Sequence, residues 1–188
     1  MLNKGVNNME EKINYSVSID IEKNGYKRYR YNYVKCWDEK EKKIIVILLN
    51  PSKATLTRND KTLDILTETF LNKYGGMIVL NLFSLMSTMP IDLIDKERIY
   101  EDKNWKNVTC FLEKNIDKDF FIGWGKSFAG IKDKNIIKEA KDKKKIVESF
   151  FRNNKIKGNV FCFRSKYGRA LHPSKYLDSW EYGDYFKR

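Results

Sequence analysis

The sequence predicts one α/β domain, in which a four-stranded parallel sheet forms the middle of a three-layer α/β/α arrangement and an antiparallel hairpin precedes it. Three observations predict this class. Four short, strongly apolar runs have the composition of strands that are covered on both faces. Segments with helical spacing separate these runs, and such alternation is typical of right-handed βαβ units. The length of 188 residues fits a single domain.

The first predicted element is the hairpin. Tyr15–Ile21 alternates apolar with polar residues, as a half-buried strand does. Asn24-Gly25 is a hairpin-turn signal, and Tyr26–Trp37 continues as a second strand in which aromatic and basic residues alternate. Residues 1–12 are polar and irregular. We therefore expect a flexible N-terminus over residues 1–12 and a single domain over residues 13–188.

The parallel sheet and its helices follow. Its strands are predicted at Ile44–Leu49, Met77–Leu82, Asp119–Gly123 and Asn159–Phe163. Its helices are predicted at Lys61–Lys73, Asp102–Glu113 and Asp133–Phe151. Asp60 is a plausible N-cap for the first helix, and Gly75-Gly76 ends it.

The charge is strongly positive but unevenly distributed. The formal net charge is +12, and residues 131–157 alone carry ten basic and four acidic side chains. A cationic surface attracts polyanions such as nucleic acid. A lysine-rich, well-solvated helix gives the same composition, and the charge alone favours neither interpretation.

Several classes of protein are excluded or disfavoured. No apolar run reaches the length of about 20 residues that a bilayer crossing needs, and the first residues lack the apolar core of a secretory signal. Cys36, Cys110 and Cys162 have no metal-type spacing, so a reducing cytoplasm is expected. His172 is the single histidine, which excludes a multi-histidine metal site. We expect no metal and no cofactor, and the oligomeric state stays open.

Polar or glycine-bearing segments follow all four predicted parallel strands. Because the carboxyl ends of parallel strands share one edge, ligands bind there in open α/β sheets. The candidate residues are Asn50, Pro51 and Ser52, then Asn81 and Phe83, then Trp124 and Gly125, and finally His172 and Ser174. Each motif also has a structural explanation as a turn, a core side chain or a loop residue. Their coincidence at one edge favours a cleft.

Cations flank the same predicted edge. They are Lys126, Arg164, Lys166 and Arg169. Phosphate groups of nucleic acid are contacted mainly by such side chains, so these four are candidate nucleic-acid-binding residues.

The ordered motifs resemble those of an uncharacterised domain-of-unknown-function family found in bacteria and their phages. The motifs that carry this resemblance are Arg28–Tyr31, Trp37, Leu49–Ser52, Asp60 with Thr62, Asn81–Phe83, Thr88 with Pro90, Trp124-Gly125, and His172-Pro173 with Tyr176 and Leu177. The resemblance covers most of the chain. Lys61 departs from it, because the family often has proline at this position.

A more distant resemblance links the same motifs to the uracil-DNA glycosylase superfamily, which implies the four-stranded parallel sheet and a site at this edge. By this resemblance Asn50 positions a water, Asn81 reads the edge of a base, and His172 donates a proton or hydrogen bond to the departing base. Trp124-Gly125 and His172-Pro173-Ser174 match its later motifs. Its base-stacking aromatic has only Tyr74 and Phe83 as candidates.

The resemblance implies hydrolysis of an N-glycosidic bond to a nucleobase in DNA or in a nucleotide. Asn50 cannot act as a general base, so Asp60 is an alternative, unless Asp60 only caps its helix. A second hypothesis is a non-catalytic nucleic-acid or nucleotide-binding module of the same fold, which the Asn at position 50 favours. A third is an interaction protein whose basic face binds an acidic partner.

Overall fold

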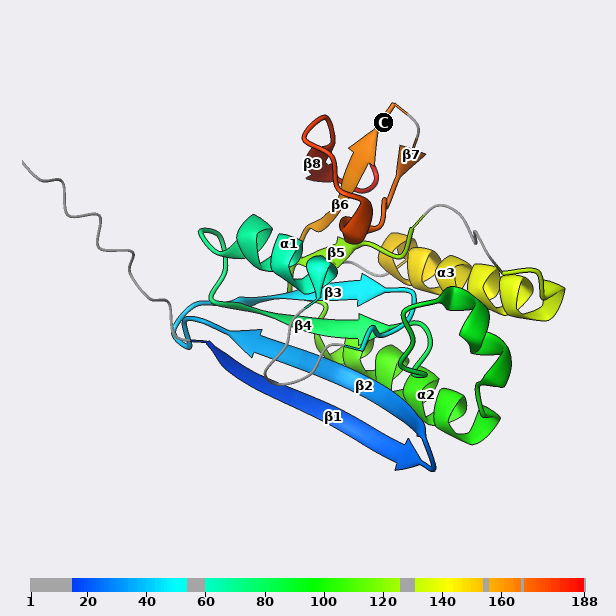
Figure 1. The fold of residues 1–188 in the computed structure, drawn as a ribbon. Helices are drawn as coiled ribbons and strands as arrows, with labels where there is room; N and C mark the ends of the chain where they lie inside the picture. The colour runs from blue at the N-terminus through cyan, green and yellow to red at the C-terminus, as the bar shows by residue number, and fades with distance from the viewer. Residues whose placement is uncertain (1–14, 54–59, 126–130, 154–155, 167, 188) are drawn as a thin grey trace, which may run out of the picture.

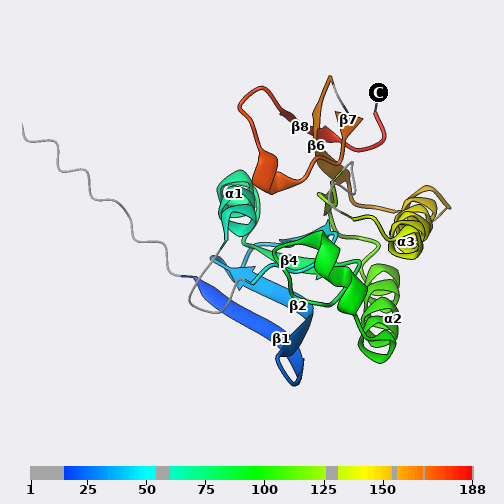
Figure 2. The same ribbon diagram turned by 45° about the vertical axis from the view of Figure 1, so that its right-hand side comes forward.

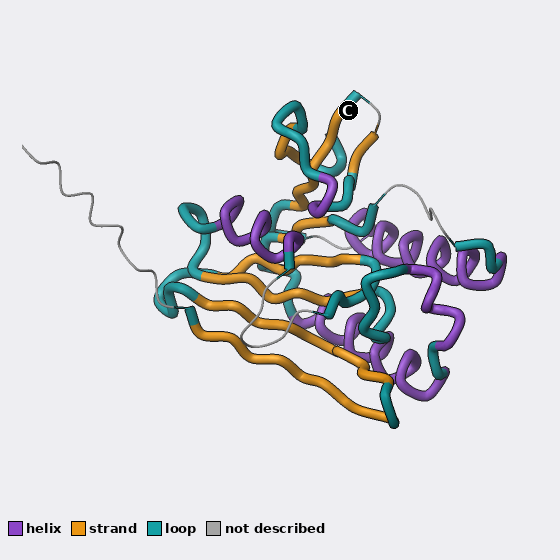
Figure 3. Tube along the Cα trace, in the orientation of Figure 1, coloured by secondary structure: helices purple, strands orange, loops and turns teal. Residues whose placement is uncertain are grey.

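The computed structural model describes residues 15–53, 60–125, 131–153, 156–166 and 168–187. Its strands are β1 (Ser16–Asn24), β2 (Lys27–Cys36), β3 (Lys43–Leu48), β4 (Gly76–Asn81), β5 (Phe120–Ile122), β6 (Val160–Ser165), β7 (Gly168–Arg169) and β8 (Glu181–Asp184). Its helices are α1 (Lys61–Phe70), α2 (Arg98–Lys114) and α3 (Lys134–Asn153), with short 3₁₀ turns η1 (Pro90–Asp95) and η2 (Pro173–Lys175). Figure 3 shows how these helices and strands alternate along the chain. The predicted N-terminal segment, residues 1–12, lies outside the described residues.

One mixed sheet contains all of these strands (Figure 1). The strand order is β1-β2-β4-β3-β5-β6-β7, and β8 pairs with β6. The pairs β4–β3, β3–β5 and β5–β6 are parallel, whereas β1–β2, β2–β4, β6–β7 and β6–β8 are antiparallel. The predicted α/β class is confirmed. The predicted extent of the sheet needs correction, because antiparallel strands extend it on both sides into an eight-stranded sheet.

Helices cover the two faces of the sheet (Figure 2). On the α1 face, Leu63, Leu66 and Phe70 of α1 pack with buried residues of β3 and β4. On the opposite face, residues of α2 and α3, among them Val108 and Val147, pack with the alternate residues of the same strands. Successive side chains of a strand point to opposite faces of the sheet. A side chain at the end of a strand therefore lies either on the α1 face or on the face of α2 and α3.

An irregularity in the hairpin changes the direction of side chains in β2. Pairing with β1 shifts after Asp20, which lies opposite Asn32, whereas the next residue of β1 lies opposite Arg30. The extra residue in β2 is Tyr31, which makes this a β-bulge. Tyr31 packs on the α2 and α3 face, but Tyr33 packs on the α1 face.

The C-terminal strands were not among the predicted elements. β8 has the sequence Glu-Tyr-Gly-Asp, which carries no apolar run. Tyr182 nevertheless anchors this strand on the α1 face, where its ring stacks on Phe161 at a centroid distance of 5.0 Å. A short strand at the edge of a sheet needs only one buried face, so its signal in the sequence is weak.

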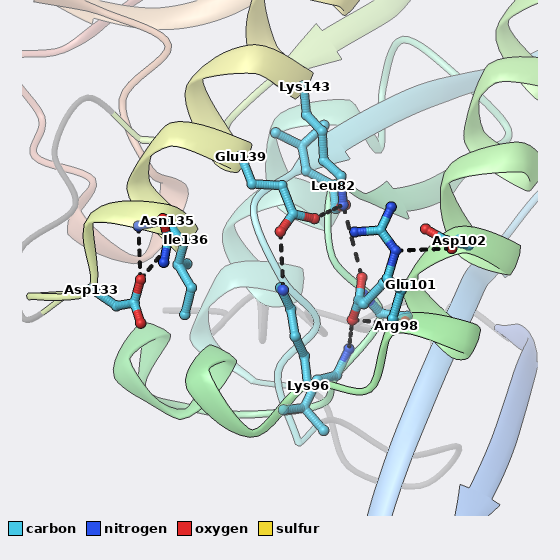
Figure 4. A network of polar contacts seen from close by, with 12 residues as sticks. Leu82, Lys96, Arg98, Glu101, Asp102, Asp133, Asn135, Ile136, Glu139 and Lys143 are labelled. Atoms are coloured by element: carbon cyan, nitrogen blue, oxygen red, sulfur yellow. Dashed lines mark hydrogen bonds and ion pairs between the residues drawn. The ribbon is translucent and has the colours of Figure 1, made fainter.

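A buried polar network fixes the segment that follows β4 (Figure 4). The Glu101 carboxylate, on α2, accepts hydrogen bonds from the backbone N–H groups of Ser84 (3.0 Å) and Leu85 (3.2 Å) and from the Ser84 hydroxyl (2.9 Å). Lys143, on α3, donates to the Leu82 carbonyl at 2.9 Å and lies 4.0 Å from Glu101. Desolvation raises the pKa of Glu101, whereas Lys143 and these donors oppose the increase.

Removing Glu101 should strongly destabilise the fold. Glu101→Ala leaves the buried N–H groups of Ser84 and Leu85 without their acceptor and removes the negative charge 4.0 Å from the Lys143 ammonium, so we expect a loss of about 3–5 kcal/mol in the free energy of unfolding. The control is Asp102→Ala, because Asp102 is exposed and pairs only with exposed Arg98. That variant should stay within about 0.5 kcal/mol of the parent. Urea unfolding measures both, and equal losses would contradict the role given to the network.

Candidate functional site

The segments that follow β3 and β4 remain side by side beyond the ends of these strands. The backbone N–H of Phe83 donates to the Leu49 carbonyl, and that of Ser87 donates to the Pro51 carbonyl, each at 2.9 Å. The side-chain amide nitrogen of Asn50 donates to the Ser87 carbonyl, also at 2.9 Å. Asn50 is therefore held in one orientation at the edge where the parallel strands end, which we call the carboxyl edge.

Glycines allow the C-terminal loop to approach the end of β5. A Cβ on Gly123 would lie 2.9 Å from Leu48 Cδ2 and 3.1 Å from Pro173 Cδ. Gly125 has a φ of +78°, a left-handed conformation that favours glycine, and its N–H donates to the Ala170 carbonyl at 2.9 Å. The Gly-Trp-Gly motif thus brings His172 and its loop against β5, on the α1 face.

The imidazole of His172 is partly buried and oriented by its own turn. Its Nδ1 lies 2.9 Å from the Ser174 hydroxyl and accepts the Ser174 backbone N–H at 3.3 Å. Because a backbone N–H can only donate, the proton of the neutral ring is on Nε2. Burial lowers the pKa of His172 below its usual value, and the charges of Lys175 and Lys144 act in the same direction, while Asp60 opposes them. A neutral imidazole with a proton on Nε2 is a hydrogen-bond donor at neutral pH.

Asp60 begins α1 and also acts electrostatically on the carboxyl edge. Its Oδ1 accepts the Leu63 backbone N–H at 3.0 Å, which is the geometry of an N-cap. Its charge also raises the pKa values of His172, Arg30 and Tyr33. The cap function is therefore present in the structure, and a role as general base stays a prediction.

Asn81, the last residue of β4, is fully buried. Neither Oδ1 nor Nδ2 has a hydrogen-bond partner within the described part of the chain. Its backbone carbonyl accepts Asn104 Nδ2 at 3.0 Å, which fixes the end of β4 from α2. Alternation with Met77 and Val79 directs the Asn81 side chain to the α1 face. Buried amides are almost always paired, so this one requires an explanation.

Arg30 is a buried cation that lies in the Arg28–Tyr31 motif but was not among the predicted site residues. Its side chain is 1% exposed, and its Nε and Nη1 have no hydrogen-bond partner among the described residues. The guanidinium lies 5.4 Å from the centre of the Tyr33 ring, which is on the α1 face. Burial lowers the pKa of Arg30 to about 10, against the opposing effect of Asp60. The signals in the sequence are its place in the Arg28–Tyr31 motif and its position within the aromatic run Tyr29–Tyr33.

Three aromatic candidates belong to the core. Phe83 is fully buried on the face of α2 and α3, under the Lys143 ammonium at 4.2 Å. Trp124 is buried on the same face, where its ring meets Tyr185 edge-on. Tyr74 lies just before the start of β4, at the opposite edge, and its hydroxyl donates to Asp119 at 3.0 Å. The α1 face of the carboxyl edge therefore receives none of these three rings.

The flanking arginines hold the C-terminal segment. Arg164 Nη1 donates to the Asp184 carbonyl at 2.9 Å, and Arg169 Nη1 donates to the Tyr185 carbonyl at 3.0 Å. Lys166 is exposed, and Lys126 lies outside the described residues. Pro51 is buried beneath the Asn50 turn, and Ser52 is partly exposed.

A cavity of about 400 Å³ lies beside the Asn50 turn, between the hairpin and the segment after β4. Its lining residues are Tyr26, Lys27, Arg28, Lys53, Leu85, Met86, Ser87, Asp92 and Asp95. Ser87 connects this cavity to Asn50.

Within the described ranges, no group of three or more His, Cys, Asp or Glu residues is arranged to hold a metal ion. Among the helices that the structure describes, none has the length and apolarity needed to cross a bilayer.

The titration of the single histidine tests this electrostatic environment. We expect the His172 resonance to titrate below the usual pKa of 6.5, and Asp60→Asn to lower the midpoint further, because it removes the charge that opposes the shift. Asn also caps helices well, so α1 is retained. The unfolded chain takes the proton more readily, so stability falls as the pH decreases from about 6.5 through the folded pKa.

Proton NMR measures the midpoint without assignment, because the chain has one histidine. Asp64→Asn is the control, since Asp64 lies in the same helix and is not among the charges that act on His172. A midpoint above 6.5, or equal shifts in both variants, would contradict the described environment.

Comparisons with known proteins give one match. Searches against curated proteins and against solved structures found none. Residues 30–174, from Arg30 of β2 to Ser174 of η2, match the family described as a protein of unknown function (DUF1643). This range contains every candidate residue at the carboxyl edge. The chain therefore belongs to the DUF1643 family.

Proposed function

We propose that the protein binds a nucleobase, in DNA or in a nucleotide, at the carboxyl edge and hydrolyses its N-glycosidic bond. One observation carries this proposal: the carboxyl edge combines a neutral His172 donor with the unpaired amide of Asn81 on the α1 face. The parallel order of β4, β3, β5 and β6, with helices on both faces, supports it further. The resemblance to uracil-DNA glycosylases implies parallel strands with helices on both sides, so these features are consistent with the proposal.

The reaction needs stabilisation of a departing base anion. Cleavage leaves positive charge on the sugar and negative charge on an oxygen of the base. His172 Nε2–H is the donor for that oxygen, and its lowered pKa keeps the ring neutral before the reaction. Such a donor in a site that excludes water contributes a factor of about 10²–10³ in rate.

Two residues are alternatives for handling the attacking water. The amide nitrogen of Asn50 donates to the Ser87 carbonyl, and this hydrogen bond orients the side chain. An amide cannot accept a proton from water as a general base. Asp60 has a carboxylate whose charge acts on His172. If Asn50 holds the water, the reaction is slow and favours bases that are weakly bonded in the duplex. If Asp60 acts, it combines general-base catalysis with capping of α1.

Recognition of the base falls to Asn81. An amide has one donor group and one acceptor, so it matches the edge of an unpaired base. The base must leave its stack to reach a buried side chain, which costs a few kcal/mol and is easiest for a mispaired or single-stranded base. The three cysteines are free thiols, which supports a reducing cytoplasm as the location of this activity.

A second candidate function is binding without catalysis. Asn50 in place of an acid favours it, as do the core positions of Phe83 and Tyr74, which remove both predicted candidates for stacking on a flipped base. Such a module would bind nucleic acid with a strong dependence on salt and would release no base.

Base release tests the proposed reaction. Purified protein is incubated with a panel of mismatched and modified DNAs and nucleotides, and released bases are detected by mass spectrometry. We expect release from at least one substrate, and His172→Ala should reduce its rate by about 10²–10³, because the donor to the leaving oxygen is lost. Asp178→Ala, an exposed change in the same loop, should leave the rate unchanged. Salt-dependent binding without release would favour the non-catalytic module, and neither binding nor release would contradict both proposals.

A further inference from the structure

Two buried cations on opposite faces of the sheet differ in their partners. Lys143 is 7% exposed and has partners, since its ammonium donates to the Leu82 carbonyl at 2.9 Å and pairs with Glu139 at 3.0 Å. Arg30 is 1% exposed, and its Nε and Nη1 have no acceptor among the described residues. Lys143 therefore has a structural role that its contacts explain, whereas the contacts of Arg30 leave its charge unexplained.

The surroundings of Arg30 compensate its charge only in part. The Tyr33 ring provides a cation–π contact, and the charge of Asp60 attracts the guanidinium. Asp60 Oδ1 is already committed to the start of α1. Taking a guanidinium out of water without a hydrogen-bonded acceptor is costly, so side chains in this state are rarely retained for stability alone.

Asn81 adds a second unpaired group on the same face. β2 and β4 are adjacent antiparallel strands, and the Arg30 backbone N–H donates to the Ser84 carbonyl just beyond the end of β4. The side chains of Arg30 and Asn81 thus project from neighbouring strands, on the α1 face, at the carboxyl edge. A ligand at this place would meet the guanidinium of Arg30, which can only donate hydrogen bonds. It would also meet the amide of Asn81, which has one donor group and one acceptor.

We propose that Arg30 and Asn81 form a binding site for an anionic oxygen group of a ligand. Arginine has no acceptor, so the ligand must present oxygens to it, and a negative charge on that group compensates the buried cation. The group is either the phosphate of a nucleotide or an ionised oxygen edge of a base. The choice of a nucleotide or base as ligand rests on the proposed function, whereas the anion site itself does not require glycosidic cleavage.

A residue retained for a ligand has a characteristic effect on stability. Without ligand, Arg30→Met removes an unpaired buried charge and replaces it with an apolar side chain, so the melting temperature should stay the same or increase. Lys143→Met is the matched control, because it removes a buried cation that has partners. It should lower the melting temperature by about 5 °C or more. A purely structural Arg30 would instead behave like Lys143.

The binding test uses inorganic phosphate, the four natural deoxynucleosides and their 5′-monophosphates as probes. Affinity is measured by calorimetry on the parent chain, Arg30→Met and Asn81→Leu. We expect at least one probe to bind the parent and to lose about 10- to 100-fold in affinity in Arg30→Met. Binding confined to phosphate-bearing probes identifies the phosphate as the anionic group, whereas Arg30-dependent binding of a deoxynucleoside identifies the base.

Two results would overturn the proposal. The first is destabilisation or unfolding of Arg30→Met in the absence of ligand, to the extent seen in Lys143→Met. The second is the absence of any probe whose affinity depends on Arg30. Asn81→Leu gives an independent check, because it should also keep the melting temperature while weakening the same probe.

Discussion

The parallel pairing of β3 with β4 and β5 is the constraint on which the rest of the structure depends. Because these strands run in the same direction, the segments that follow them meet at one edge, and hydrogen bonds such as Phe83 N–H to Leu49 O continue the contact past their ends. Gly123 then lets the loop of η2 pack against β5. Residues far apart in the chain, from Arg30 to His172, are brought to this edge by topology.

The two faces of the sheet treat buried polar groups differently. On the face of α2 and α3, Glu101 and Lys143 are fully connected to each other and to the segment after β4. On the α1 face, Arg30 Nε and Nη1 and the Asn81 side-chain amide are buried without hydrogen-bond partners in the part of the chain that the structure describes. A connected network specifies a fold, whereas unpaired groups cost stability unless a ligand completes them. The first face therefore supports the edge, and the second face carries the proposed chemistry.

Apolar patterning predicted most of the elements of the fold. The run at residues 44–49 coincides with β3 to within a residue, and the Asn24-Gly25 turn joins β1 to β2. Periodicity could not reveal β8, which has no apolar run, or the bulge at Tyr31, which depends on pairing between two strands. The bulge matters for the site, because it places Tyr31 and Tyr33 on opposite faces of the sheet, although residues two apart in a regular strand share a face. Simple alternation therefore could not predict the face on which Arg30 lies.

The sequence predicted the polar ends of the strands but not the environment of each side chain. Phe83 looked like part of the site because it follows Asn81, yet alternation stops after Leu82 and the ring enters the opposite core.

The most direct measurement is a crystal structure of the protein with a bound deoxynucleoside 5′-monophosphate. We expect the ligand at the carboxyl edge, with an anionic oxygen on Arg30 and the base near Asn81 and His172 Nε2. A ligand bound only in the cavity beside Tyr26, with Arg30 and Asn81 still unpaired, would contradict it.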